Sequence, residues 1–220
     1  MNILGFDTSS SACSIALLTR NKVQEVHEIA PMQQAKTILP FIQELLSSHQ
    51  LTLNELDAIA FGCGPGSFTG TRIASCAAQG MGFAMQIPLI PISSLAILAQ
   101  TAYQEHDWEN SMVAVDARMG QVYWALYQVT SSSNTVTLIN KELLCAPNDI
   151  LLPETGDWHG VGDGWQTFSE IMIKKLPFLP RDFDSTLLPR ATALLSLALS
   201  KLQDGDATVA PAAALPSYLR

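Results

Sequence analysis

Residues 3–18, ILGFDTSSSACSIALL, and residues 112–127, MVAVDARMGQVYWALY, follow one plan. Each stretch begins with a short apolar strand that ends at an aspartate, Asp7 or Asp116, and then passes through a turn into a second apolar strand. The dipeptide Ala-Leu follows both aspartates after nine and ten residues. This self-similarity indicates a duplicated start, one copy in each lobe, although coincidence is the alternative because strand–turn–strand units are common.

The rest of the chain alternates between the periods of strands and helices. The pattern predicts strands at residues 2–6, 12–18, 23–29, 56–61, 88–92, 112–115, 122–129, 135–144 and 158–161. It predicts helices at residues 35–46, 68–85, 95–104, 165–175 and 191–202, with Ser93 as the cap of the third. The order β-β-β-α-β-α-β-α implies a sheet covered by helices, hence the α/β class. We expect two lobes, residues 1–108 and 109–220.

Charge and composition exclude two classes of protein. The 220 residues include 12 Lys and Arg against 20 Asp and Glu, which gives a net charge of −8, and 48% are apolar. So apolar a chain with so few charges is not disordered. A protein that binds nucleic acid on its own needs clustered cations, but residues 1–108 and 109–220 each carry a net −4.

The sequence favours a cytoplasmic protein that binds no metal of its own. The first residues have no basic segment typical of a signal peptide, and no apolar run is long enough for a membrane span. The four cysteines show no C-x-x-C spacing, which predicts reduced thiols. The four histidines are isolated from one another, so we expect no metal site.

A glycine-rich segment, residues 62–72 (GCGPGSFTGTR), joins a predicted strand to a predicted helix. Such a loop can direct backbone amides at an anion, with Ser67 or Thr69 as helix cap. No Lys follows the last glycine, so it is not a P-loop, and a tight connection without a ligand is an equal alternative. The helix after it is rich in Gly and Ala, which indicates close approach of another backbone, from the same lobe or from another subunit.

The turn after the first strand is the candidate cofactor site. Asp7, Thr8 and Ser9, with Asp116 in the second lobe, could serve a metal–water complex beside a nucleotide phosphate. Capping of the turns by Asp and Ser explains the same residues equally well. No catalytic motif of a hydrolase is present, and the pair Asp182 and Asp184 is typical of a solvated loop. The sequence therefore predicts no catalytic residue.

Four segments together resemble the bacterial TsaB (YeaZ) family of tRNA threonylcarbamoyladenosine biosynthesis proteins. They are ILGFDTSSSACSIALL, the long segment that contains GPGSFTGTRIASCAAQGMGFAMQ, VAVDARMGQVYWALY and the closing ALPSYLR. The likeness runs nearly end to end. It implies the actin-like ATPase (sugar kinase/Hsp70/actin) fold, with two related lobes that each start β-β-β.

The resemblance also implies a function. Family members take part in forming N6-threonylcarbamoyladenosine (t6A) at position 37 of tRNAs that read codons beginning with adenine. The paralogue TsaD transfers the threonylcarbamoyl group, and the small ATPase TsaE joins the complex. TsaD carries a metal-binding H-x-x-x-H motif that this sequence lacks. The resemblance thus implies a non-catalytic partner that meets tRNA only through the complex, with no cofactor of its own and ATP at most weakly bound.

Family members pair through the N-terminal lobe, as homodimers and with TsaD. The two helices at residues 35–46 and 69–85 are the natural candidates for that interface. The interface residues expected from the resemblance are Ile38, Leu39, Ile42, Leu46, Ile73, Ala74, Ala77 and Met81. The alternative to a scaffold is an enzyme, an ATPase or a peptidase, in which Asp7, Thr8 and Asp116 would serve nucleotide phosphates. Direct binding of tRNA is a third hypothesis, which the net charge of −8 disfavours.

Overall fold

The computed structural model describes residues 1–29, 31–154, 156–205 and 208–219, and they form two compact units. Unit 1 comprises residues 1–97 and 189–217, and unit 2 comprises residues 98–188 and 218–220. The expected division between residues 108 and 109 differs from this one in two ways. Unit 1 already ends at Ile97, and the chain returns to unit 1 after Leu188. Each unit contains a five-stranded mixed sheet.

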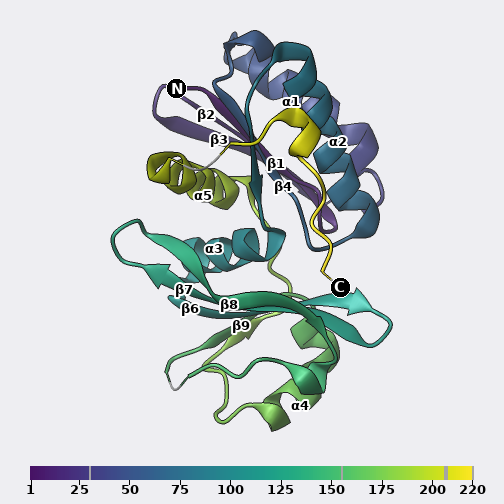
Figure 1. Ribbon diagram of the computed structural model, residues 1–220, viewed down its shortest axis with the longest axis vertical. Coiled ribbons are helices and arrows are strands. Elements are labelled where there is room, and N and C mark those ends of the chain that lie inside the picture. Colours follow the sequence, from purple (N-terminus) through teal and green to yellow (C-terminus); the bar gives the residue numbers. More distant parts are fainter. Residues whose placement is uncertain (30, 155, 206–207, 220) are drawn as a thin grey trace. The chain divides into compact units, whose positions relative to one another are not determined.

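Unit 1 is built on the sheet order β3-β2-β1-β4-β5 (Figure 1). The strands are β1 (Ile3–Asp7), β2 (Ala12–Thr19), β3 (Lys22–Ile29), β4 (Ala58–Gly62) and β5 (Leu89–Ile92). The first three strands are antiparallel neighbours, and β4 and β5 run parallel to β1. The helices of this unit are α1 (Gln34–Ser48), α2 (Phe68–Met85), α5 (Ala191–Asp204) and the first turn of α3 (Ser94–His106).

The helices of unit 1 cover both faces of its sheet. Leu4 and Phe6 of β1 belong to a core shared with α1 and α2. On the other face, a Cβ atom at Gly5 would lie 2.9 Å from the side chains of Leu194 and Leu195 of α5. The sheet is therefore buried on both sides, which explains why every residue of β1 and β2 is buried.

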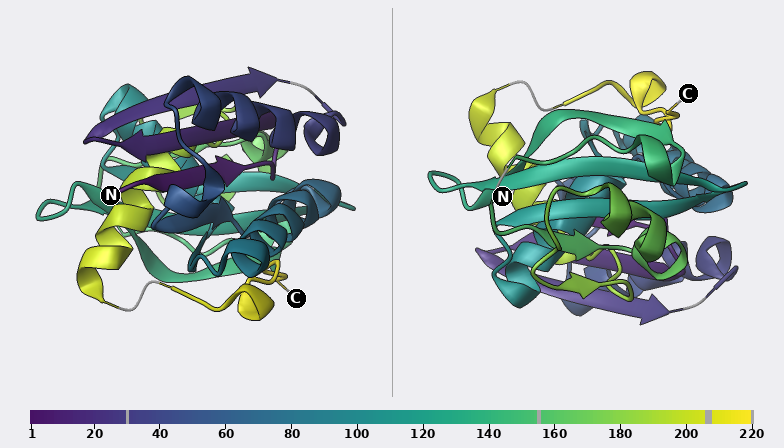
Figure 2. Two further views of the ribbon diagram at one scale, coloured as in Figure 1. Left: turned by 90° about the horizontal axis from the view of Figure 1, so that it is seen from above. Right: turned by 90° about the horizontal axis from the view of Figure 1, so that it is seen from below.

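Unit 2 repeats the topology of unit 1. Its sheet order is β10-β9-β6-β7-β8. When the strands of each unit are numbered in chain order and this sheet is read from β8, the order is third, second, first, fourth, fifth, as it is in unit 1. The strands are β6 (Asn110–Arg118), β7 (Gln121–Thr130), β8 (Thr135–Cys145), β9 (His159–Val161) and β10 (Phe183–Asp184). In the view from below, α4 (Gly164–Lys175) lies over the strands (Figure 2). The ring centres of Trp165 of α4 and Trp124 of β7 lie 6.0 Å apart. The α/β class is confirmed, and so is the duplication, because each unit starts with three antiparallel strands in the same sheet order.

The return of the chain to unit 1 depends on side chains that are far apart in sequence. Glu25 of β3 accepts hydrogen bonds from the guanidinium of Arg190 (2.6 and 3.1 Å) and from the amide of Thr192 (3.2 Å). Ser14 Oγ of β2 accepts the amide of Ala191 at 2.8 Å. Two side chains of the first sheet thus satisfy amides that α5 would otherwise leave unpaired at its start. The sequence near residue 190 contains no local pattern that predicts this contact.

All of the predicted strands and helices are confirmed, with ends that shift by at most three residues. The predicted cap Ser93 accepts the amides of Leu95 and Ala96, at 3.2 and 3.4 Å. Strand β10 was not expected, because it has only two residues and depends on backbone pairing with β9. The C-terminal tail forms a bridge between Val209 and Leu89 and a single 3₁₀ turn at Pro211–Ala213.

Candidate functional site

Asp7, the first candidate for a cofactor, is buried at the end of β1 with 1% of its surface exposed. One carboxylate oxygen accepts the amide and the hydroxyl of Ser9, at 2.9 and 2.8 Å. The other accepts the hydroxyl of Ser94 at 2.9 Å. Burial raises the pKa of Asp7 above its usual value, more than the hydrogen bonds from Ser9 and Ser94 lower it. The carboxyl group is therefore committed to partners within the chain.

The polar groups of Thr8 and Ser9 in this turn also bond to partners within the chain. Thr8 is fully buried, and its hydroxyl donates to the carbonyl oxygen of Gly70 at 2.7 Å. The carbonyl oxygen of Ser9 accepts the amide of Ser67 at 2.7 Å. The turn and the glycine-rich segment thus bind each other directly, and the backbone amide of Ser67 does not face an anion.

The glycines of the segment are explained by this contact. A Cβ atom at Gly62 would lie 1.8 Å from the Asp7 carboxylate, and one at Gly70 would lie 1.9 Å from the carbonyl oxygen of Thr8. No side chain fits at either position without displacing the turn. Ser67 caps α2 by accepting the amide of Gly70 at 3.3 Å, so Ser67 is the cap and Thr69 lies within the helix. Of the two readings of this segment, the geometry favours the tight connection.

Asp116, the second candidate, has a different environment in unit 2. Its side chain is 14% exposed, and it accepts the amide of Arg118 at 2.7 Å and the guanidinium of Arg118 at 3.3 Å. Its own amide donates to Asp163 at 2.9 Å. Burial raises the pKa of Asp163, and the nearby Asp116 charge adds to this effect. The arrangement ties the end of β6 to the start of α4.

Most of the residues expected at a partner interface are buried within unit 1. Five of the eight are at most 8% exposed and pack α1 and α2 against the sheet: Ile38, Ile42, Leu46, Ala74 and Met81. Ile73 and Ala77 are half-buried, and Leu39 is 55% exposed. The five buried residues are a correction to the expected interface, because the apolar stripe that the periodicity detects is the one that faces the sheet.

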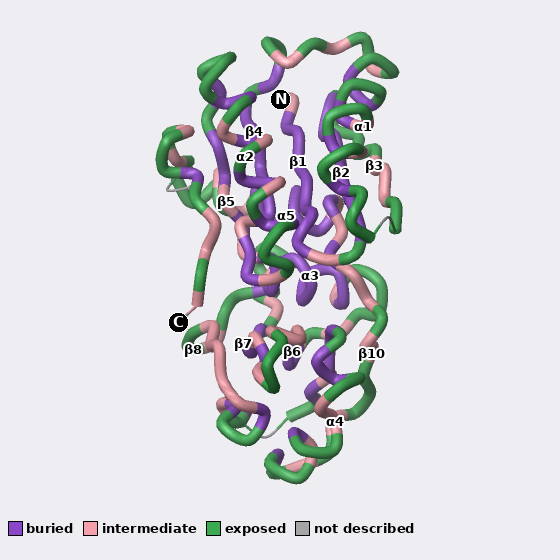
Figure 3. The backbone as a smooth tube through the Cα atoms, turned by 90° about the vertical axis from the view of Figure 1, so that its right-hand side faces the viewer, coloured by how far each residue is buried: buried purple, intermediate pink, exposed green. Residues whose placement is uncertain are grey.

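The outward face of α2 is apolar as well, which the sequence pattern did not distinguish. Phe68, Arg72, Cys76, Gly80 and Phe83 follow one another at intervals of four, four, four and three residues, and all are exposed. Phe68 is 62% exposed and Phe83 is 81% exposed. The guanidinium of Arg72 lies 3.4 Å from the ring centre of Phe68. Figure 3 shows buried and exposed segments alternating along α1 and α2. We call these five residues the outer α2 face.

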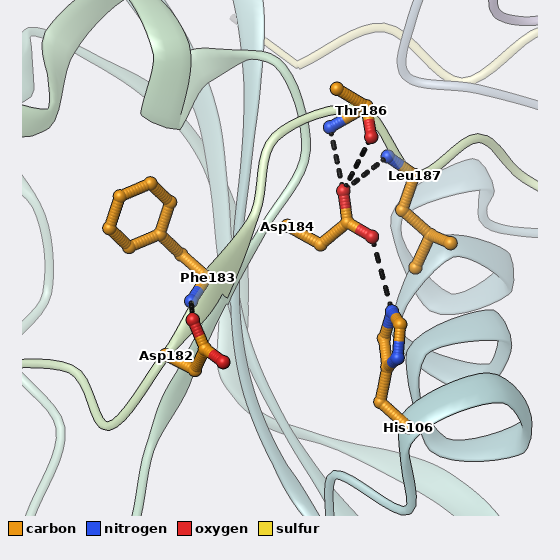
Figure 4. Close-up of polar contacts among 6 residues, drawn as sticks. All are labelled: His106, Asp182, Phe183, Asp184, Thr186 and Leu187. Atoms are coloured by element: carbon orange, nitrogen blue, oxygen red, sulfur yellow. Dashed lines mark hydrogen bonds and ion pairs between the residues drawn. The ribbon is translucent and has the colours of Figure 1, made fainter.

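A polar cluster in unit 2 was missed by the sequence analysis (Figure 4). Asp184 is not solvated as expected: one oxygen accepts two bonds from Thr186 and one from the amide of Leu187, at 2.8 to 3.0 Å. Nε2 of His106, at the end of α3, lies 3.1 Å from the other oxygen. Burial acts to raise the pKa of Asp184, but the bonds from Thr186, His106 and Leu187 together lower it. Asp182 instead accepts the amide of Phe183 and remains exposed.

Three further observations concern the described part of the chain. Within residues 1–29, 31–154, 156–205 and 208–219, no three His, Cys, Asp or Glu side chains gather as metal ligands would. Across those same residues, the helices are too short or too polar to span a bilayer. The four cysteines are free thiols.

Comparison with known proteins gives a consistent result. The family model of tRNA N6-adenosine threonylcarbamoyltransferase, TsaD, matches residues 21–218. The tRNA threonylcarbamoyladenosine biosynthesis protein TsaB of Escherichia coli K12 is 36% identical over 100% of this chain and 95% of its own length. TsaB of Haemophilus influenzae is 38% identical over 90% of this chain and 85% of its own length. The solved structure of YeaZ from Pseudomonas aeruginosa has a TM-score of 0.92 and 41% identity, covering 99% of both chains. On this evidence of sequence and fold, the chain belongs to the TsaB (YeaZ) family.

Proposed function

We propose that this chain is a non-catalytic subunit in the formation of N6-threonylcarbamoyladenosine at position 37 of tRNAs that read codons beginning with adenine. In this role it binds and positions the transferase TsaD, together with TsaE, and it pairs with itself when alone. Relatives along its full length are named for threonylcarbamoyladenosine biosynthesis, which supports the pathway. The match to the TsaD family model supports an association with that transferase. The free thiols are typical of the cytoplasm, where we place the complex.

The outer α2 face is the observation that carries the partner role. A helix on the surface of a protein normally exposes polar residues on its outer side. Among the residues of α2 the only charged one is Arg72, and the two phenylalanines are more than half exposed. Exposed apolar surface of this kind marks a protein–protein contact. Leu39, which is 55% exposed on α1, is the one residue of the expected interface that clearly faces outward.

Gly80 gives this face a centre. Gly70 and Gly82 of the same helix are explained within the chain, because a Cβ atom would lie 1.9 Å from Thr8 and 2.8 Å from Leu89. A Cβ atom at Gly80 would meet nothing within 4 Å. Glycine inside a helix costs about 1 kcal/mol relative to alanine, so its presence here has no reason within unit 1. Close approach of a partner backbone would supply a reason, so Gly80 favours the origin in another subunit, whereas Gly70 and Gly82 are explained within the same lobe.

The geometry argues against the enzyme hypothesis for the first lobe. A phosphate site at Asp7, Thr8 and Ser9 would need these groups to face solvent or ligand. Instead, the Asp7 carboxylate and the Thr8 hydroxyl bond within the chain, and the glycine-rich segment closes over the turn. We therefore propose that the chain has no nucleotide at this turn and that any ATP chemistry belongs to its partners. With a net charge of −8, contact with tRNA also falls to the partners.

Reconstitution with purified components tests this proposal. We expect t6A formation to require the chain and TsaD, and we expect neither to transfer the threonylcarbamoyl group alone. Phe83→Glu should weaken the binding of TsaD at least tenfold, which corresponds to about 1.4 kcal/mol, because a charge replaces apolar contact area. Ile171→Glu, on the exposed side of the equivalent helix α4, is the matched control and should leave binding unchanged. Full transfer by TsaD alone would refute the partner role.

A further inference from the structure

Three aromatic rings stack against one another at one corner of unit 2. The indole of Trp108 lies between two imidazoles, with ring centres 4.5 Å from His106 and 4.6 Å from His159. The planes of Trp108 and His159 are nearly parallel, at 9°, whereas the His106 ring is tilted by 35°. The three residues come from the end of α3, the connection that follows it and the start of β9. We call them the corner stack.

The corner stack is tied to the short outer strands of the sheet. Nε2 of His106 lies 3.1 Å from the Asp184 carboxylate, which joins α3 to β10 (Figure 4). The amide of Gly160 donates to the carbonyl oxygen of Asp182 at 2.9 Å. The amide of Gly162 donates to that of Asp184 at 3.0 Å. Because so few bonds hold strands of two and three residues, this edge is a region where local opening costs little free energy.

His159 is held in a place that suits only its neutral form. The residue is half-buried, and its Nδ1 atom is buried with no hydrogen-bond partner among the described residues. A protonated imidazole carries hydrogen on both ring nitrogens, so the charged ring would leave a buried N–H unpaired. Burial lowers the pKa of His159, and the backbone of Asn110 opposes this effect only in part.

The charged groups around His159 do not compensate for that cost. Asp157 and Asp182 favour its protonated form, whereas Arg181 disfavours it. Arg181 is paired with Asp157 at 2.6 Å, so that carboxylate is committed to another cation. From α3, the titratable group on the other side of the indole is His106. Once both histidines are protonated, two cations share one indole, and they repel each other.

We propose that this corner of unit 2 is a pH-sensitive latch, closed while His159 is neutral and stacked on Trp108. Protonation drives the imidazole out of the stack toward water, because only there can both N–H groups be satisfied. The edge formed by β9 and β10 then loses its aromatic tie to the end of α3 and opens more often. A lowered pKa means that the closed latch binds the proton less tightly than the open one, so closure is favoured above the ordinary histidine pKa and is lost as pH falls. The latch is a property of the chain alone and does not rest on the proposed function.

Hydrogen exchange of two amides measures the state of the latch. Gly160 and Gly162 donate to β10, so their protection factors, corrected for the intrinsic exchange rate, report whether the edge is closed. We expect both factors to fall about fivefold or more from about pH 8 to about pH 5. Amides of β1 in the same spectra control for changes in global stability. Protection of Gly160 and Gly162 that stays constant, or that falls only as much as in β1, would overturn the latch.

Three variants assign the effect to one ring. His159→Phe keeps a flat ring against Trp108 and takes up no proton, so the pH dependence should disappear. His106→Gln keeps a donor toward Asp184 without a titrating ring, and the pH dependence should persist. His49→Gln, at the end of α1 in unit 1, is the matched control and should leave it intact. A pH dependence that survives in His159→Phe, or that vanishes in His106→Gln, would contradict the assignment.

The ring signal of His159 in the unaltered chain provides a second measurement, which holds even if His159→Phe does not fold. In NMR spectra recorded against pH, this signal should titrate below the pH at which an exposed histidine does. Titration at or above that pH would mean that the stacked position tolerates the charge, and the latch would then be overturned.

Discussion

The turns after the first strand of each unit occupy the same place in the topology, yet their environments are opposite. Asp7 is 1% exposed and bonded to Ser9 and Ser94, with the glycine-rich segment packed on it. Asp116 lies in an exposed hairpin and pairs with Arg118. The difference arises in the segments around each turn: residues 62–70 close over the first, while β6 continues past Asp116 as a hairpin. The two units therefore share a topology, but the aspartates at equivalent turns differ in exposure and in hydrogen-bond partners.

The helices that follow the fourth strand of each unit show the same contrast. α2 and α4 both bury a methionine, Met81 at 8% and Met172 at 0% exposure. Their outer sides differ, because α4 exposes Glu170, Lys174 and Lys175, whereas α2 exposes two phenylalanines. The inner faces of the two helices are alike because both pack against a sheet. The outer faces are free of that constraint, and they differ between the units. Unit 1 is thus the unit whose helix after the fourth strand has an exposed apolar outer face.

The largest expected effect tests the equivalence of the inner faces. Met81→Glu and Met172→Glu should each destabilise the chain by about 4 kcal/mol, because each places an unpaired charge in an apolar core. Phe83→Glu, on the outer α2 face, should change stability by less than about 0.5 kcal/mol. Urea unfolding of the isolated chain measures all three. Equal losses for Met81→Glu and Phe83→Glu would contradict the assignment of the two faces.

The next effect sharpens the contrast between the two turns. Gly62→Ala should destabilise the chain by about 3 kcal/mol, because the new Cβ atom would lie 1.8 Å from the Asp7 carboxylate. Gly120→Ala meets nothing within 4 Å, and only its φ of +74° is unfavourable, so about 1 kcal/mol is expected. Thermal unfolding distinguishes them. A mild effect of Gly62→Ala would show that the segment can open away from Asp7.

A smaller effect compares the ion pairs of the two units. Arg190→Ala should cost about 2 kcal/mol, because Glu25 is only 9% exposed and would lose both guanidinium bonds at the start of α5. Arg118→Ala removes a pair whose arginine is 84% exposed, so the loss should be about 0.5 kcal/mol. Chemical denaturation of both variants provides the measurement. Similar losses would mean that the ion pair of Arg190 with Glu25 contributes little to holding α5 in unit 1.

The smallest expected effect is a pair of opposite dependences of the unfolding free energy on pH, one due to Asp7 and one due to Asp184. The pKa of Asp7 is raised by burial, so its contribution to stability declines as pH rises through the raised value. The pKa of Asp184 is lowered by its hydrogen bonds, despite burial, so its contribution is lost as pH falls through the lowered value. Asp7→Asn should flatten the first slope and Asp184→Asn the second, in unfolding free energies measured from about pH 3 to about pH 8. A slope that survives its own substitution would assign it to another group.

The sequence by itself determined the strands, the helices and the duplication. Short apolar runs mark β1, β2, β6 and β7, and the period of α1 and α2 is clear, because these signals arise from neighbours along the chain. The resemblance carried by GPGSFTG and DARMGQVYW supplied the family, which the comparisons confirm. Local sequence also named Ser93 as a cap, and it offered Ser67 as one of two candidates for the cap of α2.

Only the tertiary structure decided which faces and groups remain available. Periodicity identifies an apolar stripe but not whether a sheet already covers it, so Ile42 and Met81 were assigned to a partner although they are buried in unit 1. The role of Asp7 depends on Ser94, 87 residues away, and the return of α5 depends on Glu25, 165 residues from Arg190. Such contacts are set by the packing of distant segments, for which a single sequence contains no local signal.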